Sequence, residues 1–433
     1  MKRDSVKLVW DSKNKLVKAN GINNIELMAE VYPWALKEGS DSVEIKDLQY
    51  QLAPINRRLI QGDNYNVMQF LLENGYSEKF DLIYLDPPYY SETNYNSKIK
   101  IGHKDKERSI TRPIFKDSWD NLDAYLDYLY PILTLSKELL SKEGNLFVHL
   151  DWHASHYIKV ILDEIFSKER FINQIVWCYG GGSGAKRYFH RKHDIILWYS
   201  KSNDYIFNPQ YRPYTEKTLD RGLTKVKGNK YVLNEKGALM QDWWTDINKI
   251  LSPTAYENLK FPTQKPMALV QRIIKAGSNE NSLVGDFFCG SGTTAQVAEN
   301  LNRFWVVCDN NNIAVQTTQN RLIESNSHPF TIETTMPWSG EFNSLNINWK
   351  YDDNNLMVSL DSKKTDIDML NFWEIGIKEQ DVFKSMFQLI RPKENLTYLP
   401  DKIVLKNIEL IRDKKIIVNA YDYLGNIKQA SLG

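Results

Sequence analysis

Cysteine is scarce in this 433-residue sequence, and a hydrophobic run long enough to cross a membrane is missing from it. The three cysteines, Cys178, Cys289 and Cys308, are odd in number and widely spaced, which argues against both a disulfide framework and a zinc cluster. No apolar run reaches about 18 residues, and the first residues lack the apolar segment of a signal peptide. We therefore expect a cytoplasmic protein without a membrane partner.

A strong excess of charge of either sign is also missing, since the formal net charge is +1. The charge is unevenly distributed, because residues 180–275 hold 17 Lys and Arg against 8 Asp and Glu, a local balance of +9. This pattern is typical of a protein that binds a polyanion, and a solvated lysine-rich surface is the alternative. The candidates for phosphate contacts are Lys186, Arg187, Arg191 and Lys192.

The stretch 81–90, DLIYLDPPYY, combines an apolar run with a rigid turn. The run suits a buried parallel strand, and Asp86 follows it directly. Pro87 and Pro88 offer carbonyl oxygens without an N–H group, so the turn presents hydrogen-bond acceptors beside the ring of Tyr89. The exocyclic amine of a nucleobase, which is flat and donates two N–H bonds, would fit there. The alternative is a strand that is capped by a proline turn and carries a solvated aspartate.

A second turn contains the cofactor pattern G-x-G-x-x-G/A. Gly290, Gly292 and Ala295 match it after an expected strand at 283–287, and Asp309 lies about 20 residues on, where an acid binds ribose hydroxyls. The order predicts a βαβ unit that binds a dinucleotide or another adenosine cofactor. A phosphate loop is excluded, because Gly-Lys-Ser/Thr is missing.

Further acids and histidines are weaker candidates. Asp63 follows an expected strand end at 59–61, so it is a candidate for a nucleobase or ribose contact, with helix N-capping as a compatible role. Asp151, His153 and His156 resemble part of a metal site, but no further ligand lies nearby in a recognisable spacing. We predict no metal. Residues 90–116 read as a long polar loop.

Together these motifs resemble the DNA amino-methyltransferases whose catalytic motif precedes the cofactor motif, as in the modification subunits of restriction systems. The resemblance runs from about Leu59 to Arg321. It rests on GD at 62–63, DPPY at 86–89, HLDWHASHY, RKHDIILWYSKS, PTQKP at 262–266 and DFFCGSGTT at 286–294. Phe287 departs from the family, which usually has proline there, and its bulky ring could shift the cofactor slightly.

The resemblance implies S-adenosylmethionine as cofactor and the N6 amine of an adenine, flipped out of duplex DNA, as substrate. Asp86, Pro87, Pro88 and Tyr89 would be catalytic: the acceptors hold the amine and the ring stacks on the base. For the cofactor it implies that Phe288, Gly290 and Gly292 line it, Asp286 binds its ammonium group, Asp309 its ribose and Asp63 its adenine, and that Lys265 approaches its carboxylate.

The implied fold is α/β, a Rossmann-like, seven-stranded, mostly parallel sheet, permuted so that the first α/β unit comes late in the chain. We predict an N-terminal extension (1–55), a catalytic half with DPPY (56–200), a target-recognition insertion (201–260), a cofactor-binding half (261–324) and a small α+β accessory domain (325–433). In that last domain, residues 402–426 read as a β-hairpin turning near Asp413 and Lys414. The accessory domain would serve packing, dimerisation or a restriction subunit.

Other functions stay open. Cytosine N4 is an exocyclic amine that the same turn could hold. A nicotinamide-dependent oxidoreductase would explain the glycine turn but leaves DPPY and the basic segment unused. A catalytically silent DNA-binding protein is the third alternative.

Overall fold

The computed structural model describes residues 6–13, 24–34, 41–45, 55–102, 107–181, 186–220, 225–226, 229–230, 233–250, 252, 256–335, 343–391 and 398–432. Parts of the predicted N-terminal extension and of the predicted insertion lie outside these ranges.

Seven neighbouring strands form the centre of the largest sheet, in the order β8-β9-β7-β4-β15-β16-β3. Every pair from β7 to β3 is parallel, and β9 is antiparallel to both β7 and β8. The strands are β8 (Phe171–Cys178), β9 (His193–Ser200), β7 (Leu140–Leu150), β4 (Phe80–Leu85), β15 (Leu283–Asp286), β16 (Phe304–Asp309) and β3 (Arg57–Gln61). Strands from late in the chain thus lie in the middle of the sheet, as the permuted order predicts.

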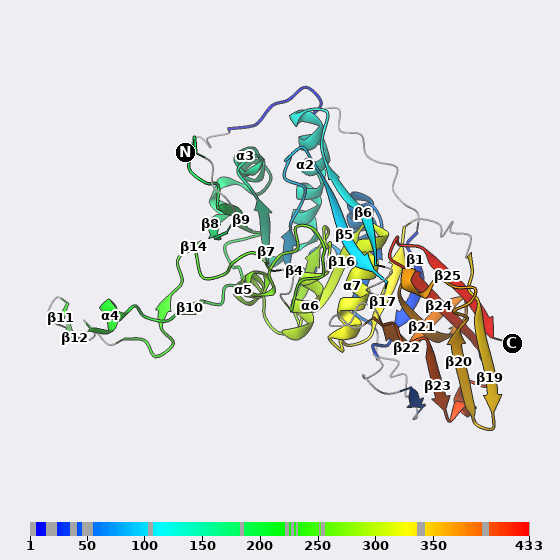
Figure 1. The fold of residues 1–433 in the computed structure, drawn as a ribbon. Helices are drawn as coiled ribbons and strands as arrows, with labels where there is room; N and C mark the ends of the chain where they lie inside the picture. Colours follow the sequence, from blue (N-terminus) through cyan, green and yellow to red (C-terminus); the bar gives the residue numbers. More distant parts are fainter. Residues whose placement is uncertain are drawn as a thin grey trace.

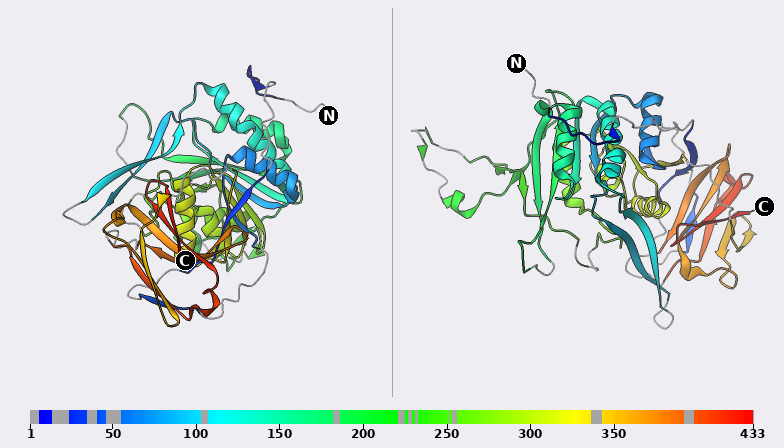
Figure 2. Two further views of the ribbon diagram at one scale, coloured as in Figure 1. Left: turned by 90° about the vertical axis from the view of Figure 1, so that its right-hand side faces the viewer. Right: turned by 90° about the horizontal axis from the view of Figure 1, so that it is seen from above.

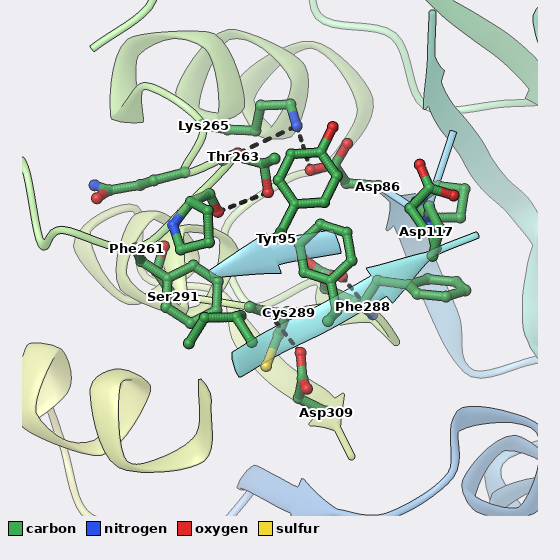
Figure 3. Close-up of a pocket in the computed structure, with 18 of the residues that line it drawn as sticks. Asp86, Tyr95, Asp117, Phe261, Thr263, Lys265, Phe288, Cys289, Ser291 and Asp309 are labelled. Carbon is green, nitrogen blue, oxygen red and sulfur yellow. Dashed lines mark hydrogen bonds and ion pairs between the residues drawn. The ribbon is translucent and has the colours of Figure 1, made fainter. Parts of the chain in front are cut away.

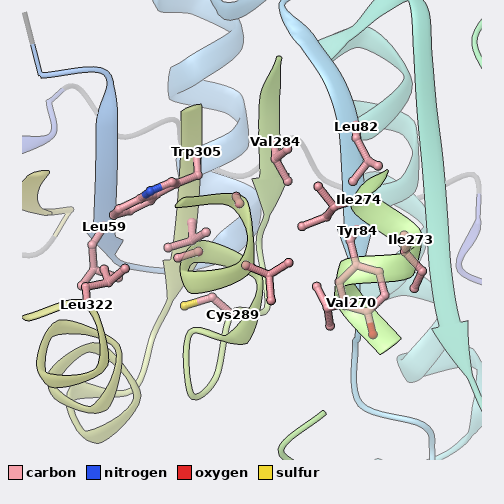
Figure 4. Close-up of a cluster of buried hydrophobic side chains, with 14 of the residues drawn as sticks. Leu59, Leu82, Tyr84, Val270, Ile273, Ile274, Val284, Cys289, Trp305 and Leu322 are labelled. Atoms are coloured by element: carbon pink, nitrogen blue, oxygen red, sulfur yellow. The ribbon is translucent and has the colours of Figure 1, made fainter. Parts of the chain in front are cut away.

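Both faces of this sheet are buried, because successive side chains of a strand point to opposite sides. In β4, Leu82 and Tyr84 belong to one apolar core, while Ile83 and Leu85 belong to the other. The first core is closed by α5 (Met267–Gly277), α6 (Thr293–Asn300) and α7 (Asn312–Glu324), and the second by α1 (Asn64–Leu71), α2 (Leu122–Leu139) and α3 (Ser155–Phe166). Figure 4 shows Leu82 and Tyr84 facing side chains of α5.

The predicted count of seven strands is wrong for the whole sheet, since fifteen strands of the described chain pair in it. At one edge β14 (Trp243–Trp244) adds to β8, and at the other β17 (Phe330–Thr334) adds to β3. The sheet then continues through β1 (Glu26–Val31), β22 (Val382–Ile390), β21 (Leu370–Glu379), β24 (Lys415–Asp422), β25 (Ile427–Leu432) and β18 (Asn343–Ser344). The outer edge of β3 is thereby covered, which removes a row of unpaired backbone groups.

The C-terminal region consists of strands and two short 3₁₀ turns (Ile367–Met369 and Ile408–Leu410) in its described residues, so the α+β expectation is wrong. A second sheet has the order β19 (Ile347–Asp352), β20 (Asn355–Leu360), β23 (Lys402–Lys406) and β2 (Ser42–Glu44). β23 and β24 belong to different sheets, which overturns the predicted hairpin near Asp413 and Lys414. An apolar core that includes Leu356, Trp373 and Leu405 joins the two sheets.

The predicted polar loop at 90–116 is instead a long hairpin of β5 (Thr93–Ile101) and β6 (Arg108–Asp117). Alternate residues of β5 are buried, a period of two that the polar composition conceals. The hairpin projects from one side of the molecule in the right-hand view of Figure 2. It contacts the C-terminal region, where Ile99 and Ile101 pack with Tyr423.

Between β9 and α5 the described residues form short elements, and all of them except β14, which pairs with β8, reach away from the sheet in Figure 1. They are β10 (Tyr211–Arg212), α4 (Glu216–Asp220), β11 (Lys225–Val226), β12 (Asn229–Lys230), β13 (Ala238–Leu239) and β14. A π-helical turn (Leu72–Tyr76) and a 3₁₀ turn (Lys168–Arg170) complete the fold. Among the described residues, no helix has the length and apolar character needed to span a membrane.

Candidate active site

A cavity of about 480 Å³ opens where β4 and β15 end side by side. From β15 the chain winds toward β16 and β3, and from β4 toward β7, so this is the point at which the strand order reverses. Such switch points leave a crevice at the carboxyl ends of the strands. Both predicted turns line the cavity, which Figure 3 shows from Asp86 on one side to Asp309 on the other.

The carboxylate of Asp86 is engaged on both oxygens. The hydroxyl of Tyr89 donates to Oδ1 at 2.5 Å, and the ammonium group of Lys265 pairs with Oδ2. Lys265 is only 9% exposed, and it also lies 5.3 Å from the centre of the Tyr89 ring. The lysine that the resemblance assigns to a cofactor carboxylate therefore contacts the catalytic candidate in this structure.

Two proline carbonyls follow Asp86 and differ in their surroundings. The hydroxyl of Tyr125 donates to the carbonyl of Pro88 at 2.9 Å. Pro87 lines the cavity, and its carbonyl accepts no hydrogen bond from the described residues. The turn thus keeps the Pro87 oxygen available as an acceptor.

Asp117, at the end of β6, holds the turn in place and was missed by sequence reasoning. Its buried carboxylate accepts from the backbone N–H groups of Tyr89, Tyr90 and Ser91 at 3.0, 2.9 and 2.9 Å. Tyr90 has a positive φ of 63°, a costly backbone conformation that this set of hydrogen bonds supports. The only available signal was the alternation in β5 and β6, which would have placed Asp117 at the foot of a hairpin.

A buried histidine packs against the ring of Tyr89. His149 stacks on Tyr89 with 6.0 Å between ring centres. Its Nδ1 lies 2.8 Å from the hydroxyl of Tyr84 and its Nε2 lies 3.3 Å from Asp194. Burial lowers the pKa of His149, so the ring is neutral and can donate from Nε2 and accept at Nδ1. Both histidine and aspartate come from the HLDWHASHY and RKHDIILWYSKS motifs.

The glycine turn holds two buried acids. Asp286 accepts from the N–H of Phe288 at 3.0 Å and from the hydroxyl of Thr294 at 2.5 Å. Asp309 accepts from the N–H of Gly290 at 2.9 Å. Burial raises the pKa of Asp286 to about 7 and that of Asp309 to about 6, and hydrogen bonds only partly oppose this. Two carboxylates in one cavity are suited to a ligand that brings positive charge and hydroxyl groups.

The two glycines have different roles. Gly290 (φ 51°) lines the cavity, and an added Cβ would lie 3.2 Å from the ring of Phe261. Gly292 (φ 73°) precedes α6, and an added Cβ would lie 2.6 Å from the side chain of Thr318. Gly290 is therefore placed for close approach of a ligand, and Gly292 for packing of α6 against α7.

Three other candidates at this edge lie as follows. Phe288 lines the cavity with its ring edge-on to Tyr128. Asp63 caps α1 by accepting from the N–H of Asn66 at 3.0 Å, and its neighbour Asn64 lines the cavity instead. Phe287 is buried against Phe80, 5.8 Å between ring centres, so its ring fills the core as well as the floor of the cavity.

The four basic candidates lie in the loop between β8 and β9, outside the cavity. Lys186, Arg187 and Arg191 are exposed, and the guanidinium of Arg191 stacks 3.8 Å from the ring centre of Trp152. Lys192 donates to the carbonyl of Gly181. They are basic residues at the end of the sheet where β4 and β7 finish.

Asp151 and His153 form a local pair, since the carboxylate accepts from the N–H of His153 at 2.8 Å and lies 2.7 Å from its Nδ1. Within the described ranges, no group of three or more His, Cys, Asp or Glu side chains could hold a metal ion.

A family model described as DNA methylase matches residues 80–320, more than half of the chain. The type II methyltransferase M.EcaI of Enterobacter cloacae is 28% identical over 328 residues, which cover 60% of this chain and 68% of that protein. The type II methyltransferase M1.MboII of Moraxella bovis is 34% identical over 230 residues, which cover 50% of this chain and 86% of that protein. The DNA adenine methyltransferase YhdJ of Escherichia coli (strain K12) is 28% identical over 225 residues (51% and 69%).

Proposed function

Because the chain belongs to the DNA methylase family, we propose that it transfers a methyl group from S-adenosylmethionine to the N6 amine of an adenine flipped out of duplex DNA. The supporting observation is that the DPPY turn and the glycine turn meet in one cavity, with Asp86 and Asp286 on neighbouring strand ends. A nicotinamide-dependent reaction would leave the acceptor turn without a role.

The residues of the glycine turn fit S-adenosylmethionine, the methyl donor of this family. Its ammonium group would pair with Asp286, whose carboxylate has no cationic partner among the described residues and whose pKa is raised by burial. Its ribose hydroxyls would donate to Asp309, and Phe288 and Gly290 would border it. Asn64 is better placed than Asp63 to reach the adenine, because only Asn64 lines the cavity.

When bound, the cofactor supplies an electrophilic methyl group on a sulfonium. The chain must then present the amine with its lone pair directed at that methyl. Asp86 and the carbonyl of Pro87 would accept the two amine hydrogens, which orients the lone pair out of the plane of the base. The ring of Tyr89 would stack on the base. Tyr89 is held in place by the hydrogen bond from its N–H to Asp117 and by the stacking of His149 on its ring.

Adenine is favoured over cytosine by the first residue of the acceptor motif. In the family that the sequence resembles, aspartate at this position is typical of adenine enzymes and serine of cytosine enzymes, and this chain has Asp86. The name of YhdJ agrees with that choice. A purine also offers more area to stack on Tyr89.

Incubation with labelled cofactor and mixed-sequence duplex DNA, followed by separation of the nucleosides, is expected to place the label in 6-methyladenine. The cavity can accept either exocyclic amine, so the nucleoside is the direct readout. Label in 4-methylcytosine would show that cytosine and not adenine is the target base. Label found only when RNA is supplied would show that DNA is not the substrate.

Duplex DNA would contact the loop between β8 and β9 through its four basic residues. Neutralising Lys186, Arg187, Arg191 and Lys192 together is expected to weaken DNA binding. The slope of log affinity against log salt concentration should become less negative by about four, because each of the four phosphate contacts releases about one counterion. Binding is measured by fluorescence anisotropy at several salt concentrations.

A matched control neutralises four exposed lysines of the C-terminal region, Lys350, Lys402, Lys406 and Lys415, and should leave the slope unchanged. Equal slopes for both variants would show that the four loop residues make no phosphate contacts and are only a solvated basic surface. The restriction subunit and the homodimer stay predictions.

A further inference from the structure

The loop between β8 and β9 exposes a phenylalanine beside the candidate active site. Phe189 is 98% exposed, the largest exposed fraction among the large hydrophobic side chains of the described chain. Its neighbours Lys186, Arg187 and Arg191 are exposed cations. Exposure of a whole aromatic ring to water is unfavourable. An exposed ring within a basic loop therefore suggests an anionic partner that has flat groups on which the ring can stack.

Strand register places this loop at the catalytic edge of the sheet. Leu85, which precedes Asp86, is paired with Val148 in β7, and Leu150 is paired with Ile195 in β9. Because β9 runs antiparallel to β7, the start of β9 and the loop before it lie at the same end as Asp86. The loop and the hairpin of β5 and β6 extend from the same side of the molecule in the right-hand view of Figure 2.

The base of the loop is held by hydrogen bonds, while the Phe189 side chain is exposed. The N–H of Tyr179 donates to the carbonyl of Lys192 at 2.9 Å, which closes the loop, and its hydroxyl donates to Asp194 at 2.7 Å. The guanidinium of Arg191 lies 3.8 Å from the ring centre of Trp152 and 5.0 Å from that of Tyr188. Tyr188 is thus occupied by Arg191, whereas Phe189 extends into solvent.

A flipped base leaves a gap in the duplex that something must fill. Extruding one nucleotide costs the stacking and pairing energy of that base, and apolar side chains inserted between base steps are a known way to offset such a cost. A wedge of this kind must lie near the base-binding cavity, reach the duplex from a cationic surface and expose an apolar ring. Phe189 meets these three requirements.

We propose that Phe189 is the wedge that enters the duplex beside the extruded base and stabilises the flipped state, an inference that rests on the proposed function. Phe189 does not touch the cavity and is not a catalytic residue. It contributes only when the target base is paired and stacked, because that is when a gap has to be opened and filled.

The test uses the full-length protein and two duplexes, after the methylated position has been mapped on mixed-sequence DNA. One duplex is fully paired, and the other has an abasic site opposite the target base, which is then already unpaired. Phe189→Ala is expected to lower kcat/KM on the paired duplex by about tenfold or more and by less than about threefold on the abasic duplex. Phe189→Trp, which keeps a stacking ring, should stay near wild type on both.

Tyr398→Ala serves as the matched control, since Tyr398 is an exposed aromatic residue (53%) of the C-terminal region. It should change neither rate. An equal loss on both duplexes after Phe189→Ala, or no loss on either, would overturn the wedge, the second outcome pointing to a protein partner for the ring. Wild-type protein that methylates no DNA would overturn the proposed function itself, so the two failures are distinguishable.

Discussion

Replacing Asp86 with asparagine is expected to lower the rate of methyl transfer by about a thousandfold, the scale of losing one preorganised group that is needed only in the transition state. Asparagine keeps the size of the side chain and an amide oxygen that can accept from the buried ammonium of Lys265, whereas alanine would remove every acceptor at this position. In the proposed reaction the lost carboxylate would contact the base amine and not the cofactor. Affinity for S-adenosylmethionine should therefore stay within about threefold of wild type, as measured by calorimetry.

The control for this variant is Glu92→Gln, which removes an exposed acid six residues further along the same chain segment. It should transfer methyl groups at the wild-type rate. Near-normal turnover of Asp86→Asn in single-turnover experiments would refute the acceptor role, and a matching loss of cofactor affinity would move Asp86 into the cofactor site.

The second large effect concerns Asp286. Asp286→Asn is expected to weaken binding of S-adenosylmethionine by about a hundredfold, because a buried ammonium group would lose a charged partner in a cavity of low dielectric constant. Asparagine can still accept one of the two hydrogen bonds that Phe288 and Thr294 donate, so the turn keeps much of its shape. Thermal unfolding measured by circular dichroism checks that the variant is folded.

The pH dependence of binding identifies the carboxylate directly. The pKa of Asp286 is raised to about 7, so below pH 7 the group is protonated and must lose its proton before it can pair with a cation. Affinity should rise by about tenfold per pH unit between pH 5.5 and 7 and level off above it. In Asp286→Asn this rise should be lost, apart from a smaller contribution from Asp309, whose pKa is raised to about 6. An unchanged slope in the variant would assign the titration elsewhere.

The sequence alone was sufficient where chemistry is local. The buried strand before Asp86, the proline turn and the glycine turn after β15 are each set by fewer than about ten consecutive residues, through strand period and backbone restriction. The order of the motifs then predicted the permuted sheet, which the strand order β8-β9-β7-β4-β15-β16-β3 confirms. Family membership follows from the same motifs.

Only the tertiary structure decided how those motifs meet, because the relevant contacts join distant parts of the chain. Lys265 lies 179 residues after Asp86, and its pairing with that carboxylate depends on the approach of the segment before α5 to the end of β4. Asp117 reaches the DPPY turn only because β5 and β6 form a hairpin. Asp63 caps α1, and its neighbour Asn64 lines the cavity instead. The continuation of the sheet beyond β3 likewise depends on backbone hydrogen bonds between β17 and β3. Every residue type except proline can form these bonds, so the sequence does not reveal which strands pair there.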